Sequence, residues 1–271
     1  MTYQINYAYT SHIGKVRVNN EDNFWCCGDT LPILNQGTEG ILTGKVSLKA
    51  VPALAVFDGM GGESCGEMAA GLAAKEFGRY YEANKRVLKK KSEVFFDGIC
   101  ASMNREVCRY GEEKRIRSLG TTAAMVLFGP DSAYVGNLGD SRVYYCIDGK
   151  LRQISTDHVA GKSLFGKAPL TQYLGVTDEN MALDPSVRKL EYKPGSRYLL
   201  CSDGMTDMLT DGEIADILSR ESPAQETVQL LLERTLKKGG RDNVTIVLCE
   251  IVYREEKFFH TWIRDLKQGR R

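Results

Sequence analysis

The sequence is poor in histidine and has no excess of charge of either sign. It contains 3 His in 271 residues, and 36 Lys and Arg stand against 35 Asp and Glu. Three histidines exclude a metal centre built on several imidazoles, so a metal site in this chain must depend on carboxylates or thiolates. The balanced charge lacks the basic excess of nucleic-acid-binding proteins, and we expect no nucleic acid as a partner.

Long apolar runs and C-x-x-C cysteine motifs are also missing. No run of about 18 uncharged apolar residues occurs, so we expect no membrane-spanning helix, and the N-terminal residues lack the pattern of a signal peptide. None of the 8 cysteines forms a C-x-x-C pair, and most lie in apolar segments. We therefore expect free, buried thiols and a reducing, cytoplasmic location.

Short apolar segments separated by turns make up most of the chain. We predict helices over 63–82, 92–115 and 211–238, with Ser92 as a helix cap and a break near Pro223. Strands, two helices, more strands and then helices do not alternate as βαβ units do. This order indicates antiparallel sheets covered by helices, the α+β class. The predicted strands cover residues 3–10, 23–27, 53–58, 121–128, 133–138, 142–147, 151–154, 187–192, 197–202 and 243–251.

The chain shows no repeat and no linker, so residues 1–253 are predicted to form a single domain. Residues 28–50 are expected to form a long loop or hairpin. Residues 254–271 are net basic and contain Phe258, Phe259 and Trp262. They are predicted to form a C-terminal helical extension that docks by its aromatic face. A helix that binds a membrane surface or a partner remains the alternative.

Acidic residues recur where predicted strands meet loops. Asp58 ends one apolar segment and Asp203 ends another. An acidic residue at the end of a buried strand is costly unless it is paired or coordinated. Further acidic residues at such junctions are Glu21, Asp22, Asp140 and Asp242.

Asp-Gly pairs are common in plain turns, and the sequence offers its own comparisons. The pair at 148–149 is predicted to be a hairpin turn, and the pair at 211–212 a helix start. Asp58 differs from both, because it follows a buried strand and precedes three glycines within four residues. Such glycines let the backbone approach an ion or a phosphate closely.

Hard oxygen ligands without histidine favour Mg²⁺ or Mn²⁺ over zinc. Carboxylates from distant parts of a chain can hold two such ions about 3.5–4 Å apart, an arrangement that acts on phosphate esters through an activated water. Arg17, four residues before Glu21, can bind two phosphate oxygens at once. A plain surface arginine remains the alternative for this residue.

The sequence resembles the metal-dependent Ser/Thr protein phosphatases, the PPM or type 2C family, in their bacterial form. The similarity extends from about residue 5 to 251. The matching segments, in family order, are RVNNED (17–22), AVFDGMGG (55–62), GTTA (120–123), VGNLGDSR (135–142), DH (157–158), LTQYLG (170–175), LLCSDGMTD (199–207) and RDNVTI (241–246).

The resemblance implies a β-sandwich of two antiparallel sheets flanked by helices on both sides, with two Mn²⁺ or Mg²⁺ ions at one end. By motif position, Asp58 would bridge the two ions. Glu21 and the Gly59 carbonyl would complete the protein ligands of one ion, and Asp203 and Asp242 those of the other.

Three further roles follow from the resemblance. Arg17 would bind the substrate phosphate, and Asp22 would orient metal-bound water. Asp140, together with Asp203, matches the position of a third ion, although a turn role for Asp140 remains open.

The sequence also departs from the family pattern. Met60 stands where some members have a histidine proposed as the general acid, and Gln172 stands where an arginine is common. His158 belongs to a family motif, but we interpret it as a structural, hydrogen-bonded residue. The segment 159–169 replaces a flap of about thirty residues, so the flap is severely shortened. Because the flap affects substrate choice in relatives, substrate range is the least transferable property.

The resemblance implies a monomeric phosphoprotein phosphatase in which a metal-bridging hydroxide attacks phosphoserine or phosphothreonine directly. Its partners would be phosphorylated proteins, the products of a Ser/Thr kinase. Two alternatives remain. A regulatory or binding module with little turnover would explain Met60 and the short flap. A phosphatase of small metabolites would suit the more open site.

Overall fold

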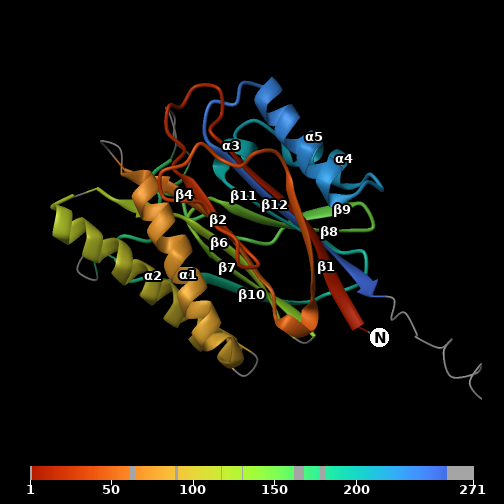
Figure 1. Cartoon of the computed structure of the whole chain (residues 1–271), viewed down its shortest axis with the longest axis horizontal. Coiled ribbons are helices and arrows are strands. Elements are labelled where there is room, and N and C mark those ends of the chain that lie inside the picture. The colour runs from red at the N-terminus through yellow and green to blue at the C-terminus, as the bar shows by residue number, and fades with distance from the viewer. Residues whose placement is uncertain are drawn as a thin grey trace, which may run out of the picture.

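The apolar strands assemble into two antiparallel sheets that lie face to face (Figure 1). The structure is a computed structural model, and it describes residues 2–61, 65–88, 91–116, 118–129, 131–161, 168–177 and 181–254. Within these ranges one sheet has the strand order β3-β1-β12-β11-β8-β9, and the other has the order β10-β7-β6-β4-β2, with β5 paired to β4.

The strands come from all parts of the described chain. The first sheet contains β1 (Thr2–His12), β3 (Leu42–Ser47), β8 (Arg142–Ile147), β9 (Lys150–Gln153), β11 (Arg197–Cys201) and β12 (Val244–Arg254). The second contains β2 (Asp22–Cys26), β4 (Ala53–Met60), β5 (Gly120–Thr121), β6 (Ala123–Phe128), β7 (Ser132–Leu138) and β10 (Ser186–Glu191).

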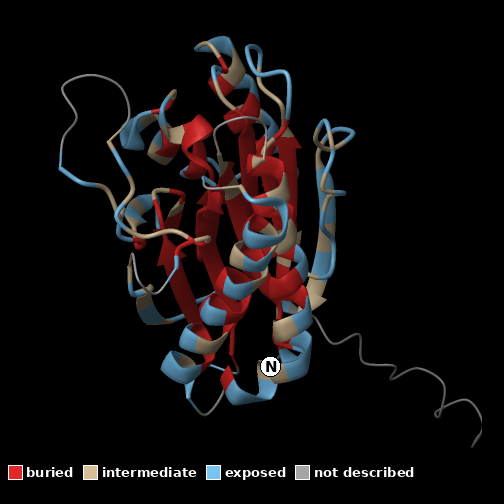
Figure 2. Cartoon of the chain, turned by 90° about the vertical axis from the view of Figure 1, so that its left-hand side faces the viewer, coloured by how far each residue is buried: buried red, intermediate tan, exposed pale blue. Residues whose placement is uncertain are grey.

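Helices cover the outer face of each sheet, and the buried residues lie between these layers (Figure 2). The sheet that contains β4 is covered by α1 (Gly66–Leu88) and α2 (Ser92–Lys114). The other sheet is covered by α4 (Asp211–Leu218) and α5 (Ala224–Lys237). Two short helices, a 3₁₀ turn (Leu48–Ala50) and α3 (Asp203–Thr206), follow strands β3 and β11. The predicted α+β class, a two-sheet sandwich with helices on both sides, is confirmed.

Apolar residues on both faces of the central strands explain the layers. On β4, Val56 packs between the two sheets and its neighbour Phe57 packs under α1 and α2. On β12, Val247 packs between the sheets and Ile246 packs under α4 and α5. Successive side chains of a strand point to opposite faces, so these apolar runs fill two core layers at once.

Local signals in the sequence fix several turns and helix ends. Asp148 and Gly149 both have positive φ angles, 49° and 71°, as expected for the tight hairpin between β8 and β9. Thr210 caps α4 in a capping box, because its hydroxyl accepts the Glu213 N–H and the Glu213 carboxylate accepts the Thr210 N–H. The predictions made for both Asp-Gly pairs are confirmed.

Two predictions about local structure were wrong, and one was incomplete. Ser92 is the first residue of α2, whose cap position is Lys91, without a side-chain cap hydrogen bond. Asp58 does not end its strand, since β4 continues to Met60 and pairs there with β5. The region 28–50 contains the edge strand β3, whose half-exposed pattern gave no strand signal. The predicted helical extension over 254–271 lies outside the described residues, apart from Arg254 at the end of β12.

No helix among the described residues is long and apolar enough to cross a membrane. None of the 8 cysteines forms a disulfide bond, and five of them are buried.

We predict that Thr210→Ala lowers the free energy of unfolding by about 1 kcal/mol, because the first turn of α4 loses its side-chain cap. Urea denaturation followed by circular dichroism measures this change. Ser219→Ala, at the exposed C-terminal end of the same helix, is the matched control and should change stability by less than about 0.5 kcal/mol. Equal effects of the two substitutions would contradict the role assigned to the cap.

Candidate metal and phosphate site

The acidic residues from the strand ends meet in one pocket. The pocket has a volume of about 340 Å³ and lies where β4, the start of α3 and the start of β12 come together. Seven of the eight residues singled out from the sequence line it, namely Arg17, Glu21, Asp58, Gly59, Asp140, Asp203 and Asp242. Met60 lines the pocket too, and Asp22 does not.

Close backbone contact at Gly59 shapes this pocket. The Gly59 N–H donates to the Glu21 carbonyl oxygen at 3.1 Å. A Cβ atom at Gly59 would lie 2.1 Å from the Gly66 carbonyl oxygen and 2.6 Å from that of Glu21. Only glycine fits between these two backbones. The glycine therefore allows the start of α1 and the residues before β2 to approach the same point of β4.

Asp58 is held by backbone hydrogen bonds to the neighbouring strands. Its N–H donates to Thr122 Oγ1 at 3.0 Å. Its carbonyl oxygen accepts from the Thr122 N–H and from Thr121 Oγ1, both at 2.9 Å. Sequence reasoning included both threonines in a matching segment but gave them no role. The break between β5 and β6 at Thr122 is the structural reason for their position.

Arg17 and Asp242 form a two-point ion pair. Arg17 Nε lies 2.8 Å from Asp242 Oδ1, and Nη2 donates to Oδ2 at 2.9 Å. This hydrogen bonding raises the pKa of Arg17 above its ordinary value. The predicted phosphate ligand and a predicted metal ligand are thus bonded to each other.

Asn243 fastens the chain that carries Arg17. Its side-chain oxygen accepts the Glu21 N–H at 2.8 Å. Its amide nitrogen donates to the carbonyl oxygens of Ile13 and Asn19, each at 2.9 Å. One side chain therefore holds both ends of the loop between β1 and β2. Sequence reasoning missed this residue, although it lies in the segment RDNVTI.

Asp22 lies behind the pocket, between the sheets. Its side chain is almost fully buried and accepts a hydrogen bond from Ser202 Oγ at 2.7 Å. Burial raises the pKa of Asp22 to about 7, against the hydrogen bonds from Ser202 and Thr245, which lower it. The predicted role of Asp22 in orienting water remains a prediction.

Crowded negative charge marks the side of the pocket next to α1. Burial raises the pKa of Glu21, the Arg17 charge opposes this rise, and the charges of Glu67 and Asp242 add to it. Glu67, in the first turn of α1, is 7% exposed, and its Oε2 atom has no hydrogen-bond partner. A buried carboxylate oxygen without a donor is costly, so a cation or a bound water is needed nearby. Sequence reasoning missed Glu67, which follows the DGMGG segment by five residues.

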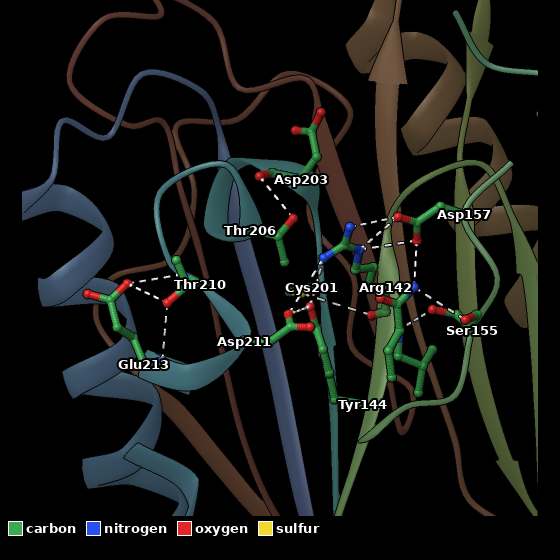
Figure 3. Close-up of polar contacts among 12 residues, drawn as sticks. Arg142, Tyr144, Ser155, Asp157, Cys201, Asp203, Thr206, Thr210, Asp211 and Glu213 are labelled. Atoms are coloured by element: carbon green, nitrogen blue, oxygen red, sulfur yellow. Dashed lines mark hydrogen bonds and ion pairs between the residues drawn. The ribbon is translucent and has the colours of Figure 1, made fainter. Parts of the chain in front are cut away.

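The Asp203 side chain points away from the polar network around Arg142 (Figure 3). The guanidinium group of Arg142 binds both carboxylate oxygens of Asp157 at 2.7–3.1 Å and donates to Tyr144 Oη at 3.0 Å. Tyr144 in turn donates to Asp211 at the start of α4. The network ties β8 to α4, while the Asp203 carboxylate points to the other side in the figure.

The segment that replaces the flap is closed at its base. Val159 and Leu170 form a β-bridge, and the Ala160 N–H donates to the Pro169 carbonyl oxygen at 2.8 Å. Residues 168–170 line the pocket, and 162–167 lie outside the described residues. His158 accepts the Gly139 N–H at its Nδ1 atom, so the predicted hydrogen bonding of His158 is confirmed, and its structural role remains a prediction.

The donor set fits hard divalent cations. Five carboxylates and the Gly59 carbonyl surround one pocket, with Arg17 as the cationic group among the lining residues described. Oxygen donors without imidazole suit Mg²⁺ and Mn²⁺. No three His, Cys, Asp or Glu side chains of the described chain already form an ion cage. The pocket carboxylates would therefore have to rotate before three of them could contact one ion.

The fold and the pocket define a class of α+β proteins in which two antiparallel sheets carry an acidic site at one end of the sandwich. The family model described as Protein phosphatase 2C matches residues 43–244, well over half of the chain. The chain therefore belongs to the protein phosphatase 2C family.

Relatives and solved structures agree with this assignment. The chain is similar to the serine/threonine protein phosphatase PstP of Mycobacterium tuberculosis, with 29% identity over 265 residues, 93% of this chain and 46% of the relative. It thus spans less than half the length of that relative. It is 26% identical to the serine/threonine phosphatase stp of Listeria monocytogenes, over 88% of this chain and 92% of the relative. A crystal structure of the PstP catalytic domain in complex with 2 manganese ions matches 93% of this chain and 100% of its own, with a TM-score of 0.74 and 27% identity.

We predict that Mn²⁺ raises the melting temperature of the protein. At a hundredfold excess over the dissociation constant the stabilisation is about 2.7 kcal/mol, which corresponds to about 5–10 °C for a domain of this size. Differential scanning fluorimetry measures the shift. Asp58→Asn should abolish most of it, whereas Asp148→Asn, in the hairpin turn outside the pocket, should retain it. A full shift in the Asp58 variant would contradict metal binding at this pocket.

Proposed function

We propose that this protein is a metal-dependent phosphatase that hydrolyses phosphoserine and phosphothreonine in proteins, using two Mn²⁺ or Mg²⁺ ions. The observation that carries the proposal is the meeting of Glu21, Asp58, Asp203 and Asp242 with Arg17 in one pocket. Membership of the protein phosphatase 2C family supports it, and so does the similarity to relatives that are named serine/threonine phosphatases.

The residues divide into ion-holding and phosphate-holding groups. Asp58 would bridge the two ions, with Glu21 and the Gly59 carbonyl on one side and Asp203 and Asp242 on the other. Asp140, with Asp203, would hold a third ion. Two bound ions would lower the pKa of a water molecule and would neutralise charge on the phosphate oxygens.

The chain itself positions substrate and protons. Arg17 is half exposed at the pocket, so its guanidinium can leave Asp242 and bind two oxygens of a phosphate. Asp22, held by Ser202, would orient water from behind the pocket. Met60 lines the pocket and has no proton to donate. We infer that water held in the pocket gives the leaving oxygen its proton.

A cytoplasmic location fits the cysteines, because eight cysteines without a disulfide bond are typical of a reducing compartment. A monomeric state remains a prediction.

The proposal predicts Mn²⁺-dependent release of phosphate from a phosphothreonine peptide and from p-nitrophenyl phosphate. Asp203→Asn should lower kcat by about 100-fold or more, because an ion loses a charged ligand. Asp148→Asn is the control outside the pocket. A malachite green assay with added Mn²⁺, and with excess chelator, measures both effects. Full activity in chelator would refute the mechanism, and turnover of phosphorylated metabolites alone would refute the protein substrate.

Arg17→Ala should have opposite effects on metal and substrate. Loss of the guanidinium should raise the KM for a phosphopeptide by about tenfold or more, because charge-assisted hydrogen bonds to phosphate are lost. The same change should tighten Mn²⁺ binding, since Asp242 loses its competing partner and a positive charge leaves the pocket. Titration calorimetry and steady-state kinetics measure the two quantities. Weaker Mn²⁺ binding in this variant would show that the ion pair supports the metal site instead of competing with it.

A further inference from the structure

A carboxylate in the first turn of α1 is buried without a complete set of hydrogen bonds. Glu67 is 7% exposed, and its Oε2 atom has no hydrogen-bond partner among the described residues. The N–H groups of Met68 and Ala69, in the same turn, donate to the Cys65 carbonyl oxygen at 3.1 and 3.2 Å. These donors are therefore already used, although first-turn N–H groups often bind an acidic side chain. Such a buried oxygen calls for a donor that the described chain does not supply.

The start of α1 contacts both residues proposed to hold one ion. The Gly66 N–H donates a hydrogen bond to the Glu21 carboxylate. A Cβ atom at Gly66 would lie 2.9 Å from Glu21 Cδ and 2.9 Å from the Gly59 carbonyl oxygen. Burial raises the pKa of Glu21, and the charge of Glu67 adds to this rise. The two carboxylates therefore lie close enough to repel each other.

We propose that Glu67 is a positioning residue of the ion site, which accepts a hydrogen bond from a water molecule on the ion at Glu21 and the Gly59 carbonyl. The proposal rests on the function proposed above. Glu67 is not among the residues that line the pocket, so it would reach an ion through water. A water on a divalent cation donates a strong hydrogen bond to a carboxylate. The ion would thus supply the missing donor and the charge that balances both carboxylates.

A purely structural role for Glu67 is the alternative, because an acidic side chain in the first turn stabilises a helix. In that case, loss of the charge would destabilise the metal-free protein and leave its affinity for Mn²⁺ unchanged. The proposed role predicts the opposite pattern. Without an ion, the Glu67 charge repels Glu21 and leaves one oxygen without a donor, so its removal does not cost stability.

Glu67→Gln tests the proposal, because glutamine keeps the size of the side chain and removes its charge. The dissociation constant for Mn²⁺ should rise about tenfold, since partners of the ligands around an ion commonly contribute this much to affinity. Titration calorimetry with MnCl₂ measures it. Differential scanning fluorimetry of the chelator-treated protein should show a melting temperature equal to or above the native one.

Glu76→Gln is the matched control in the same helix. Glu76 is 5% exposed, but its carboxylate is fully engaged: it accepts from Arg79 Nε and Nη2, both at 2.6 Å, and from Ser102 Oγ. It lies nine residues after Glu67, about 14 Å further along the helix axis. This variant should have a lower melting temperature without metal, because the ion pair is lost, and a native affinity for Mn²⁺.

The outcomes separate failure of this proposal from failure of the proposed function. An unchanged dissociation constant for Mn²⁺ in the Glu67 variant overturns the positioning role alone. A weaker affinity that comes with a lower metal-free melting temperature overturns it as well, because that pattern marks a structural residue. A native protein that binds no Mn²⁺ overturns the proposed function together with the role of Glu67.

Discussion

Mutual repulsion among buried and half-buried carboxylates is the constraint on which the site depends. Five acidic side chains line one pocket of about 340 Å³, and a sixth lies directly behind it. Like charges at such separations raise one another's pKa and destabilise the folded chain unless cations or hydrogen-bond donors balance them. In the described structure, the guanidinium group of Arg17 balances part of this charge, and hydrogen-bond donors held by the fold stabilise Asp22. The remaining excess of negative charge would favour the binding of divalent ions at this site.

The surrounding fold keeps these groups together at the cost of side-chain freedom elsewhere. Gly59 cannot carry a side chain, because two backbones approach it within contact distance. The Thr122 hydroxyl accepts a hydrogen bond from the backbone N–H of Asp58. Both ends of the Asn243 side-chain amide form hydrogen bonds with the loop before β2. Neither Thr122 nor Asn243 would touch an ion, but all three residues limit where an acidic side chain can lie. In this sense the second layer of the site is made of backbone hydrogen bonds.

The sequence predicted the layers and the set of pocket residues, because both follow from short-range patterns. Apolar runs such as 53–57 are recognisable as strands buried on two faces, and Asp58 with its glycines is recognisable against the turn at 148–149. It could not predict contacts between distant residues. The pairing of Arg17 with Asp242 joins positions 225 apart. The residues around an arginine in the sequence do not show whether it is available to bind phosphate or is already bonded to a carboxylate. The strand β3 escaped prediction for a different reason, because an edge strand with mostly exposed residues has no apolar pattern.

The pairing of β1 with β12 has a consequence for how the protein is made. The two strands pair in register from Thr2 with Arg254 to His12 with Val244, and both anchors of the Arg17 loop, Gly240 and Asn243, belong to the same late part of the chain. The pocket therefore cannot form until residues 240–254 have been synthesised and have paired with β1. Contacts of such long sequence separation fold slowly. A chain cut before Gly240 would hold Asp58 and Asp203 but would lack strand β12 and both anchors of the Arg17 loop.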